Sequence, residues 1–132
     1  MTVIVDSSVM VALLTDDGVR GEWARDTVDG QPLSAPHIVM PEAAHVLRRQ
    51  VLRGTLSADV ASLAHEDLTR MPVDLWPYVP LAPRVWALRS AVSVYDATFV
   101  ALAELLGAPL ATLDQRLVRS HAPRCHFLTP DV

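Results

Sequence analysis

Lysine is absent from this chain of 132 residues, and all 11 of its basic residues are arginines. Against them stand 15 acidic residues, so the formal net charge is −4 with neutral histidines. A protein that coats nucleic acid through a general basic face would carry the opposite balance. The charge therefore argues against that class, but it does not exclude an enzyme whose acidic site binds cations.

Cysteine is nearly absent as well, since Cys125 is the only one. A single thiol excludes both an internal disulfide and a zinc site built from cysteines of this chain. We expect Cys125 to be a small, buried or inert side chain. The five histidines are dispersed, and none is spaced from a second histidine or from Cys125 as zinc ligands on one helix would be.

Long apolar runs are also missing. The longest run near the start, Val9 to Leu14, is far shorter than the ~20 residues that a membrane-spanning helix requires. Residues 1–5 lead into Asp6 without the basic region and cleavage site of a secretory signal. We expect a protein that does not enter a membrane and stays in the cytoplasm.

The chain does contain enough apolar residues, 51%, to build a packed core at a length typical of one domain. Because aromatic residues make up only 5%, leucine, valine and alanine should form most of that core. We find no internal repeat, low-complexity tract or linker. The sequence predicts a single domain spanning residues 1–132.

Strand and helix signals alternate along the chain. Short apolar runs predict strands at residues 3–5, 33–35, 73–76, 110–112 and 126–128. Helical spacing and capping residues predict helices at residues 9–14, 20–28, 38–53, 57–70, 81–91 and 95–106. Strands separated by helices indicate an α/β domain with a mainly parallel sheet.

Four carboxylates occupy positions where such a fold could bring them together. Asp6 and Asp114 each follow a strand, and ligands bind at the carboxyl ends of strands in open α/β sheets. Asp96 and Glu42 lie at the starts of two predicted helices. Each position alone also fits a helix cap or a favourable interaction with the helix dipole, so the argument for a shared site is collective.

A site made only of carboxylate oxygens favours Mg²⁺ or Mn²⁺ over zinc. Such ions can activate water and stabilise the leaving oxygen when a phosphodiester is hydrolysed. The acids would repel one another when no metal is bound, which should raise some of their pKa values. Metal-dependent cleavage of a nucleic-acid backbone, with RNA as the expected substrate, is the chemistry that this set of acids predicts.

The order and spacing of these residues resemble PIN-domain proteins over nearly the whole chain. The matching segments are residues 3–8, the helix-borne Glu42, Tyr95-Asp96-Ala97 and residues 112–117. Within that family the chain resembles the small toxin ribonucleases of VapBC-type toxin–antitoxin pairs. No single segment carries the resemblance, which rests on their combination.

The resemblance implies a three-layer α/β/α sandwich, Mg²⁺- or Mn²⁺-dependent endoribonuclease activity on RNA, a homodimer, and inhibition by a cognate antitoxin. It assigns metal-binding and catalytic roles to Asp6, Glu42, Asp96 and Asp114, and a supporting role to Thr112. From their positions, Ser7 and Ser8 are candidates either to orient Asp6 or to cap the following helix.

Further candidates are basic and aromatic. Arg49 lies seven residues after Glu42 on nearly the same helix face, and it could hold an RNA phosphate, as could Arg116. A solvated or partner-facing position is the alternative for both. Trp23, Trp76 and Trp86 could stack on bases, although burial in a core or an interface is the more common role.

Two other functions fit parts of the sequence. A phosphotransfer domain also begins with an apolar strand that ends in aspartate, but Ser8 stands where a phosphatase would place its second acid, and the chain lacks the lysine that such families use. A non-catalytic PIN-like module that binds RNA or protein is the stronger alternative, because a fold does not dictate an activity. The presence of all four acids favours the enzyme.

Overall fold

A computed structural model describes residues 1–131 of the chain. Within those residues a sheet of five strands has the order β3-β2-β1-β4-β5, and every neighbouring pair is parallel. The strands are β1 (Val3–Val5), β2 (Leu33–Pro36), β3 (Val73–Trp76), β4 (Leu110–Ala111) and β5 (Phe127–Leu128). The predicted α/β fold with a mainly parallel sheet is confirmed.

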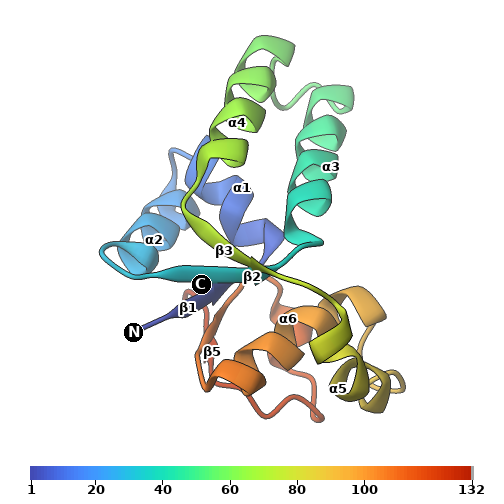
Figure 1. Cartoon of the computed structure of the whole chain (residues 1–132). Coiled ribbons are helices and arrows are strands. Elements are labelled where there is room, and N and C mark those ends of the chain that lie inside the picture. The colour runs from blue at the N-terminus through green and yellow to red at the C-terminus, as the bar shows by residue number, and fades with distance from the viewer. Residues whose placement is uncertain (132) are drawn as a thin grey trace.

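Helices cover both faces of the sheet, as the predicted three-layer sandwich requires (Figure 1). One layer contains α1 (Ser7–Thr15), α2 (Val19–Val28), α3 (Val39–Leu52) and α4 (Ala58–Arg70). The opposite layer contains the 3-10 turn η1 (Val79–Leu81), α5 (Ala82–Ala87) and α6 (Val94–Leu106), and the short helix α7 (Gln115–Val118) follows β4. Among the described residues, none of these helices is long and apolar enough to cross a membrane.

The central strand β1 is enclosed on both faces. Its residues Val3, Ile4 and Val5 are fully buried, which is typical of β-branched strands in parallel sheets covered by helices. Helix α6 packs against β1 and is buried from Ala97 to Ala103. α3 packs on α1 instead, and it buries Val39, Ala43 and Leu47 at spacings of four residues. These contacts hold β1 and its carboxyl end in a fixed position.

The path of the chain reverses at β1. From β1 it moves outward to β2 and β3 through α1 to α4, and it then returns through α5 and α6 to β4 on the other side of β1. The carboxyl ends of β1 and β4 therefore lie at the topological switch point of the sheet. In open α/β folds this is the place where a crevice forms and ligands bind.

One helix prediction needs correction, and one short helix was not predicted. The helix expected at residues 81–91 is instead η1 followed by the six-residue α5, because Pro80 and Pro83 begin short elements and the chain then turns, with Ala91 and Val92 both donating to the Leu88 carbonyl. The helix α7 was not predicted, since four residues are too short to show a period. The remaining helices and strands agree with the predictions to within two residues at each end.

α3 and α4 form a helical hairpin that extends beyond the sheet (Figure 1). The inner side of the hairpin packs on α1, and α4 buries Ala61, Ala64 and Leu68 toward it. The start of α3 remains beside the carboxyl end of the sheet, whereas its other end projects away from it. This arrangement carries Glu42, in the first turn of α3, to the switch point.

Candidate active site

Asp6 is the central acid of the site. It follows β1 directly and is the N-cap of α1, where its Oδ1 atom accepts a hydrogen bond from the Val9 amide at 3.0 Å. The side chain is only 8% exposed, so solvent contributes little to the stability of its charge. The capping role that the sequence allowed for Asp6 is therefore present together with a place in the acidic cluster.

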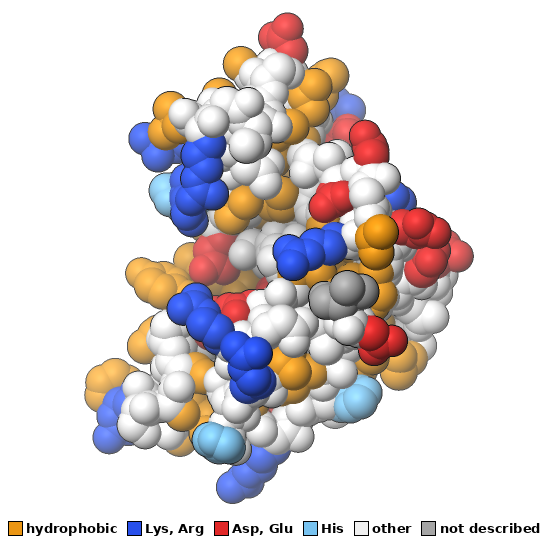
Figure 2. All heavy atoms as spheres, turned by 180° about the vertical axis from the view of Figure 1, so that it is seen from behind, with side chains coloured by type: hydrophobic (Ala, Val, Ile, Leu, Met, Phe, Trp, Pro, Cys, Tyr) orange, Lys and Arg blue, Asp and Glu red, His pale blue; other side chains and the backbone are white. Residues whose placement is uncertain are grey.

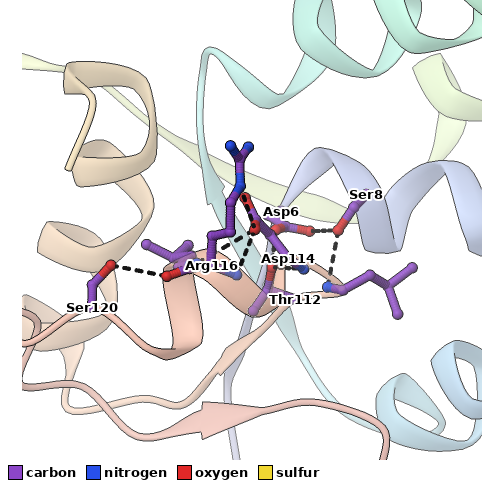
Figure 3. A network of polar contacts seen from close by, with 8 residues as sticks. Asp6, Ser8, Thr112, Asp114, Arg116 and Ser120 are labelled. Atoms are coloured by element: carbon purple, nitrogen blue, oxygen red, sulfur yellow. Dashed lines mark hydrogen bonds and ion pairs between the residues drawn. The ribbon is translucent and has the colours of Figure 1, made fainter. Parts of the chain in front are cut away.

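Two hydroxyl groups hold the Asp6 carboxylate in one orientation (Figure 3). The Ser8 hydroxyl donates to Oδ1 at 2.6 Å and accepts the Leu113 amide at 3.1 Å. The Thr112 hydroxyl donates to Oδ2 and accepts the Asp114 amide at 3.0 Å. These contacts join the end of β1 to the segment after β4, so the carboxylate cannot turn without breaking bonds on both sides.

Asp114 is the second acid that follows a strand. It is the N-cap of α7, where its Oδ1 atom accepts the amides of Arg116 at 3.0 Å and Leu117 at 3.4 Å. The Arg116 guanidinium lies 3.9 Å from the same oxygen and is largely exposed (Figure 3). Asp114 thus caps α7 and also holds the exposed Arg116 guanidinium near the rim of the site.

Glu42 and Asp96 approach the site from opposite layers of the sandwich. Glu42 lies in the first turn of α3, and Asp96 lies in the first turn of α6. Asp96 is not the cap of its helix: that role belongs to Ser93, whose hydroxyl accepts the Asp96 amide at 3.0 Å. The Asp96 carboxylate is therefore not occupied as the helix cap.

The charges of neighbouring acids contribute to the raised pKa values of Asp6, Glu42 and Asp96. The pKa of Glu42 is raised to about 7. Burial is the largest cause, and the charges of Asp96 and Asp6 make smaller contributions. The pKa of Asp96 is raised by burial and then by Asp114, while Ser93 and Arg116 partly offset the change. The repulsions form a closed ring, Asp6 to Glu42 to Asp96 to Asp114 and back to Asp6.

Burial also raises the pKa of Asp6, although the hydrogen bonds from Ser8, Thr112 and Val9 act in the opposite direction. The Asp114 charge adds to the rise. A cluster in which burial and mutual repulsion both disfavour the charged forms is stabilised by bound cations. Shifts of this kind are more frequent at functional sites than elsewhere on a protein.

Two grooves adjoin the acids. One has a volume of about 520 Å³ and is lined by residues that include Glu42, Arg49 and Tyr95. The other, of about 360 Å³, is lined by residues that include Asp96, Asp114 and Arg116. Figure 2 shows acidic side chains recessed in this region, with arginine side chains on the surfaces around them. An anionic chain could follow these arginines while the acids hold cations between them.

The donor set is one of hard oxygen ligands, which suits Mg²⁺ or Mn²⁺. Within residues 1–131, no group of three or more histidine, cysteine, aspartate or glutamate side chains is arranged so that it could hold a metal ion. Mg²⁺ usually keeps several waters and binds through only one or two carboxylates, so a looser ring of acids is compatible with it. The chemistry of these oxygen ligands suits a hydrated divalent cation, but the acids do not form a preformed metal cage.

The structure places Asp6, Glu42, Asp96, Asp114 and Thr112 around the carboxyl ends of β1 and β4, and their roles in one site stay a prediction. The contact to Asp6 comes from Ser8, whereas Ser7 lines the groove beside Glu42. Arg49 and Arg116 lie on the two grooves. Ser93 was not among the predicted site residues, although the pattern Ser93-Val94-Tyr95-Asp96 is the sequence signature of a helix start.

The remaining candidates lie elsewhere. Cys125 lies with His126 in a cavity of about 580 Å³ beside Met1 and Pro109, near the amino ends of the strands. Burial raises the pKa of the Cys125 thiol to about 11, so the thiolate is scarce at neutral pH. Trp86 is 61% exposed and stacks under the Arg89 guanidinium, 4.8 Å from its ring centre.

Comparison with known proteins gives matches over nearly the whole chain. A family model described as "PIN domain" matches residues 3–121. The VapC ribonuclease Mb0985 of Mycobacterium bovis is 37% identical over 123 residues, which cover 93% of this chain and 94% of that protein. The crystal structure of PAE2754 from Pyrobaculum aerophilum matches with a TM-score of 0.73 at 20% identity, over 96% of this chain and 83% of that one.

A chain in a toxin–antitoxin complex from Klebsiella pneumoniae also has the same fold. It matches with a TM-score of 0.64 at 18% identity, over 96% of both chains. The sequence match and the two structural matches each extend across both helical layers and the sheet between them. They therefore cover all the elements that supply the four acids.

Proposed function

The chain belongs to the PIN-domain family, and on that premise we propose that it is a Mg²⁺- or Mn²⁺-dependent endoribonuclease, the toxin of a toxin–antitoxin pair. The observation that carries the proposal is the arrangement of four acids at the switch point of the sheet: Asp6 and Asp114 follow β1 and β4, and Glu42 and Asp96 lie in the first turns of α3 and α6. The predicted resemblance to this family is confirmed by the match over residues 3–121.

Relatives support the reaction and the partner. The M. bovis relative is named a ribonuclease, and it shares 37% of its residues with this chain over 94% of its own length. The structural match in K. pneumoniae is to a chain of a toxin–antitoxin complex. We infer an RNA substrate and a cognate antitoxin from these names together with the site, and we extend the expectation of a homodimer from the sequence.

A bound Mg²⁺ or Mn²⁺ would supply activated water and stabilise negative charge on the leaving oxygen of the phosphodiester. Asp6 is the best-oriented ligand, since Ser8, Thr112 and the Val9 amide fix its carboxylate. Glu42, Asp96 and Asp114 would complete the site, partly through water.

The other residues of the chain position the RNA. Arg116 reaches past Asp114 into solvent, and Arg49 lies on the groove that contains Glu42, so each can meet a phosphate without occupying the acids. The two guanidiniums lie on different grooves, one on each side of the acidic cluster. They would draw the RNA backbone across the cluster.

The test is a cleavage assay on total cellular RNA with purified protein, with Mg²⁺, with Mn²⁺ and with EDTA. We expect cleavage that requires the cation and that is lost in Asp6→Asn and Asp96→Asn, both checked for folding by circular dichroism. Asp67→Asn is the matched control, because Asp67 is an exposed aspartate on α4 outside the site. It should cleave like the wild-type protein.

Equal cleavage by wild-type and Asp96→Asn, or cleavage that persists in EDTA, would contradict the proposal. Absence of any cleavage by a folded, metal-loaded protein would favour a binding module that retains the acids without catalysis. Copurification with a small protein encoded beside this one, and loss of cleavage in that complex, would support the antitoxin partner.

A further inference from the structure

We propose that the groove between α3 and the start of α6 holds a nucleotide next to the phosphodiester to be cut, with its base stacked on Tyr95. The inference rests on the proposed ribonuclease function and adds a substrate subsite to it. Its elements are an exposed aromatic ring, a cation and an apolar wall beside the acids.

The groove is built by three elements that meet at the switch point. Ser7 comes from the start of α1, Glu42 and Arg49 come from α3, and Tyr95 comes from α6. Its volume of about 520 Å³ lies within the roughly 300–1,000 Å³ that small-ligand sites occupy. Because Glu42 is both a groove residue and one of the four acids, anything bound here lies against the acidic cluster.

Tyr95 is placed for stacking. It directly precedes Asp96 on α6, and its side chain is 60% exposed although it lines the groove. This exposure contrasts with the body of α6, where the seven residues from Ala97 to Ala103 are all buried. An aromatic ring left in solvent beside a nuclease site is a platform on which a base of any sequence can stack.

The groove also matches the rest of a nucleotide. Ile38, Pro41 and Val46 provide an apolar wall for the base and sugar. Arg49 provides a guanidinium that fits a phosphate. Glu42 and Arg49 lie seven residues apart, two helical turns, so the cation and the acid project from nearly the same face of α3.

The groove on the other side of the acids differs in character. Its lining includes the apolar residues Ala91, Val92 and Leu117 beside the polar and charged ones, but no aromatic residue is among its lining residues in the described part of the chain. A strand that crosses the acids would therefore have one nucleotide held by its base and the next held mainly by its backbone. Single-stranded RNA with unpaired bases suits this arrangement, whereas a continuous duplex keeps its bases stacked within the helix.

The first experiment measures binding without cleavage. Fluorescence anisotropy of a labelled short oligoadenylate is recorded in EDTA with the wild-type protein, Tyr95→Phe, Tyr95→Leu and Tyr78→Leu. Tyr78→Leu is the matched control, because Tyr78 is an exposed tyrosine outside the groove. We expect Tyr95→Leu to weaken binding roughly 5- to 150-fold, while Tyr95→Phe and Tyr78→Leu bind like the wild type.

The second experiment uses a substrate taken from the mapped cleavage sites. Removing one base beside the cut should raise the KM of the wild-type enzyme. The same removal should change the KM of Tyr95→Leu little, because that variant has already lost the stacking contact. A merely structural role of Tyr95 would lower activity equally on the intact and the abasic substrate. Circular dichroism and thermal unfolding confirm that the variants fold.

The two proposals can fail separately. Binding that depends on Tyr95 without any cleavage would keep the subsite and remove the ribonuclease function. Cleavage and oligoadenylate binding that are both unchanged in Tyr95→Leu would overturn the subsite and leave the ribonuclease intact. If Tyr95→Leu loses affinity for a copurifying protein but not for RNA, the groove is a protein contact and the inference is wrong.

Discussion

The Thr112 hydroxyl donates a hydrogen bond to the Asp6 carboxylate although 106 positions of sequence separate the two residues. The register of the sheet explains the contact. Ile4 pairs with Leu110 and Val5 pairs with Ala111, so the next residues along the two parallel strands are Asp6 and Thr112. The bond therefore follows directly from the pairing of β1 with β4, and it joins the two strand ends that supply acids.

Removing this hydroxyl should damage both stability and activity. Thr112 is fully buried, so Thr112→Val would leave the Asp6 carboxylate without one of its donors, at a cost of roughly 1–3 kcal/mol in the free energy of unfolding. Loss of a residue that orients a ligand typically lowers activity about 10- to 100-fold. Thr112→Ser, which keeps the hydroxyl, should retain most of both. Denaturant unfolding and RNA cleavage rates are measured for both variants. Equal stability and equal cleavage by Thr112→Val and Thr112→Ser would contradict a role of the hydroxyl in holding Asp6.

The strand ends of the site could be predicted from sequence because they follow a simple rule. A buried β-branched strand that ends in aspartate, as Val3-Ile4-Val5-Asp6 does, points to the carboxyl edge of a parallel sheet. The positions of Glu42 and Asp96 depended instead on the way α3 and α6 pack from opposite layers, which periodicity does not specify. The choice of Ser8 rather than Ser7 as the donor to Asp6 is a matter of side-chain direction in the first turn of α1.

Burial of the acids, together with the repulsion among them, should make the metal-free protein less stable as pH rises. The pKa of Glu42 is about 7 in the folded protein and 4.5 for the free side chain, so between these values the folded state binds more protons than the unfolded state. Stability then falls with increasing pH across that window. Asp6 and Asp96 shift in the same direction.

Thermal unfolding in EDTA from pH 5 to pH 8 tests this. We expect the wild-type Tm to decrease over the range, and Glu42→Gln, which carries no charge, to show a smaller decrease and a Tm several degrees higher at pH 8. The exposed Asp67→Asn variant serves as the control for removal of an acid elsewhere. A wild-type Tm that rises steadily from pH 5 to pH 8 would show that the acids do not repel one another as described.

Addition of Mg²⁺ should reverse the loss of stability, because the cation binds the deprotonated carboxylates of the folded state. The expected result is a rise in Tm at pH 8 that grows with Mg²⁺ concentration and is much smaller at pH 5, where the acids hold protons. Asp96→Asn should reduce the rise. A shift of equal size at both pH values would indicate an unspecific effect of salt.

The contact between α1 and α2 depends on a glycine. A Cβ atom added at Gly21 would lie 1.8 Å from the carbonyl oxygen of Asp16 and 2.7 Å from its carbonyl carbon, both of them backbone atoms. Gly21→Ala should therefore destabilise the protein by about 1–3 kcal/mol, as overpacking does, although alanine favours helix in solvent. Gly107→Ala, in the left-handed C-cap of α6, is expected to cost roughly 1 kcal/mol without a clash. Denaturant unfolding compares the free energies of unfolding of the two variants. A Gly21→Ala variant more stable than the wild type would show that the added Cβ atom does not clash with Asp16.

Among residues 1–131, the most protected ion pair lies away from the four acids. Arg84 contacts Glu104 through two hydrogen bonds, of 2.6 and 3.2 Å, and donates a third to the Ala122 carbonyl at 3.1 Å. Burial would raise the pKa of Glu104, but its bonds from Arg84 and from the Arg124 amide lower it overall. The pair thus ties α5 and α6 to the segment that leads into β5.

Arg84→Met should cost roughly 1–3 kcal/mol at neutral pH, because it leaves a largely buried carboxylate without the two hydrogen bonds that Arg84 donates. The matched variant Arg70→Met breaks the exposed pair with Glu66 at 2.9 Å, which should change stability by less than about 1 kcal/mol.

The contribution of the Arg84–Glu104 pair should also depend on pH. Because the pKa of Glu104 is lowered in the folded protein, its stabilising effect is present above the ordinary pKa of 4.5 and is lost as pH falls. The difference between wild-type and Arg84→Met should therefore shrink in acid, as denaturant unfolding at pH 7 and pH 3 would show. RNA cleavage by both variants should match the wild type when they are folded, and a difference in stability that grows in acid would contradict the assignment.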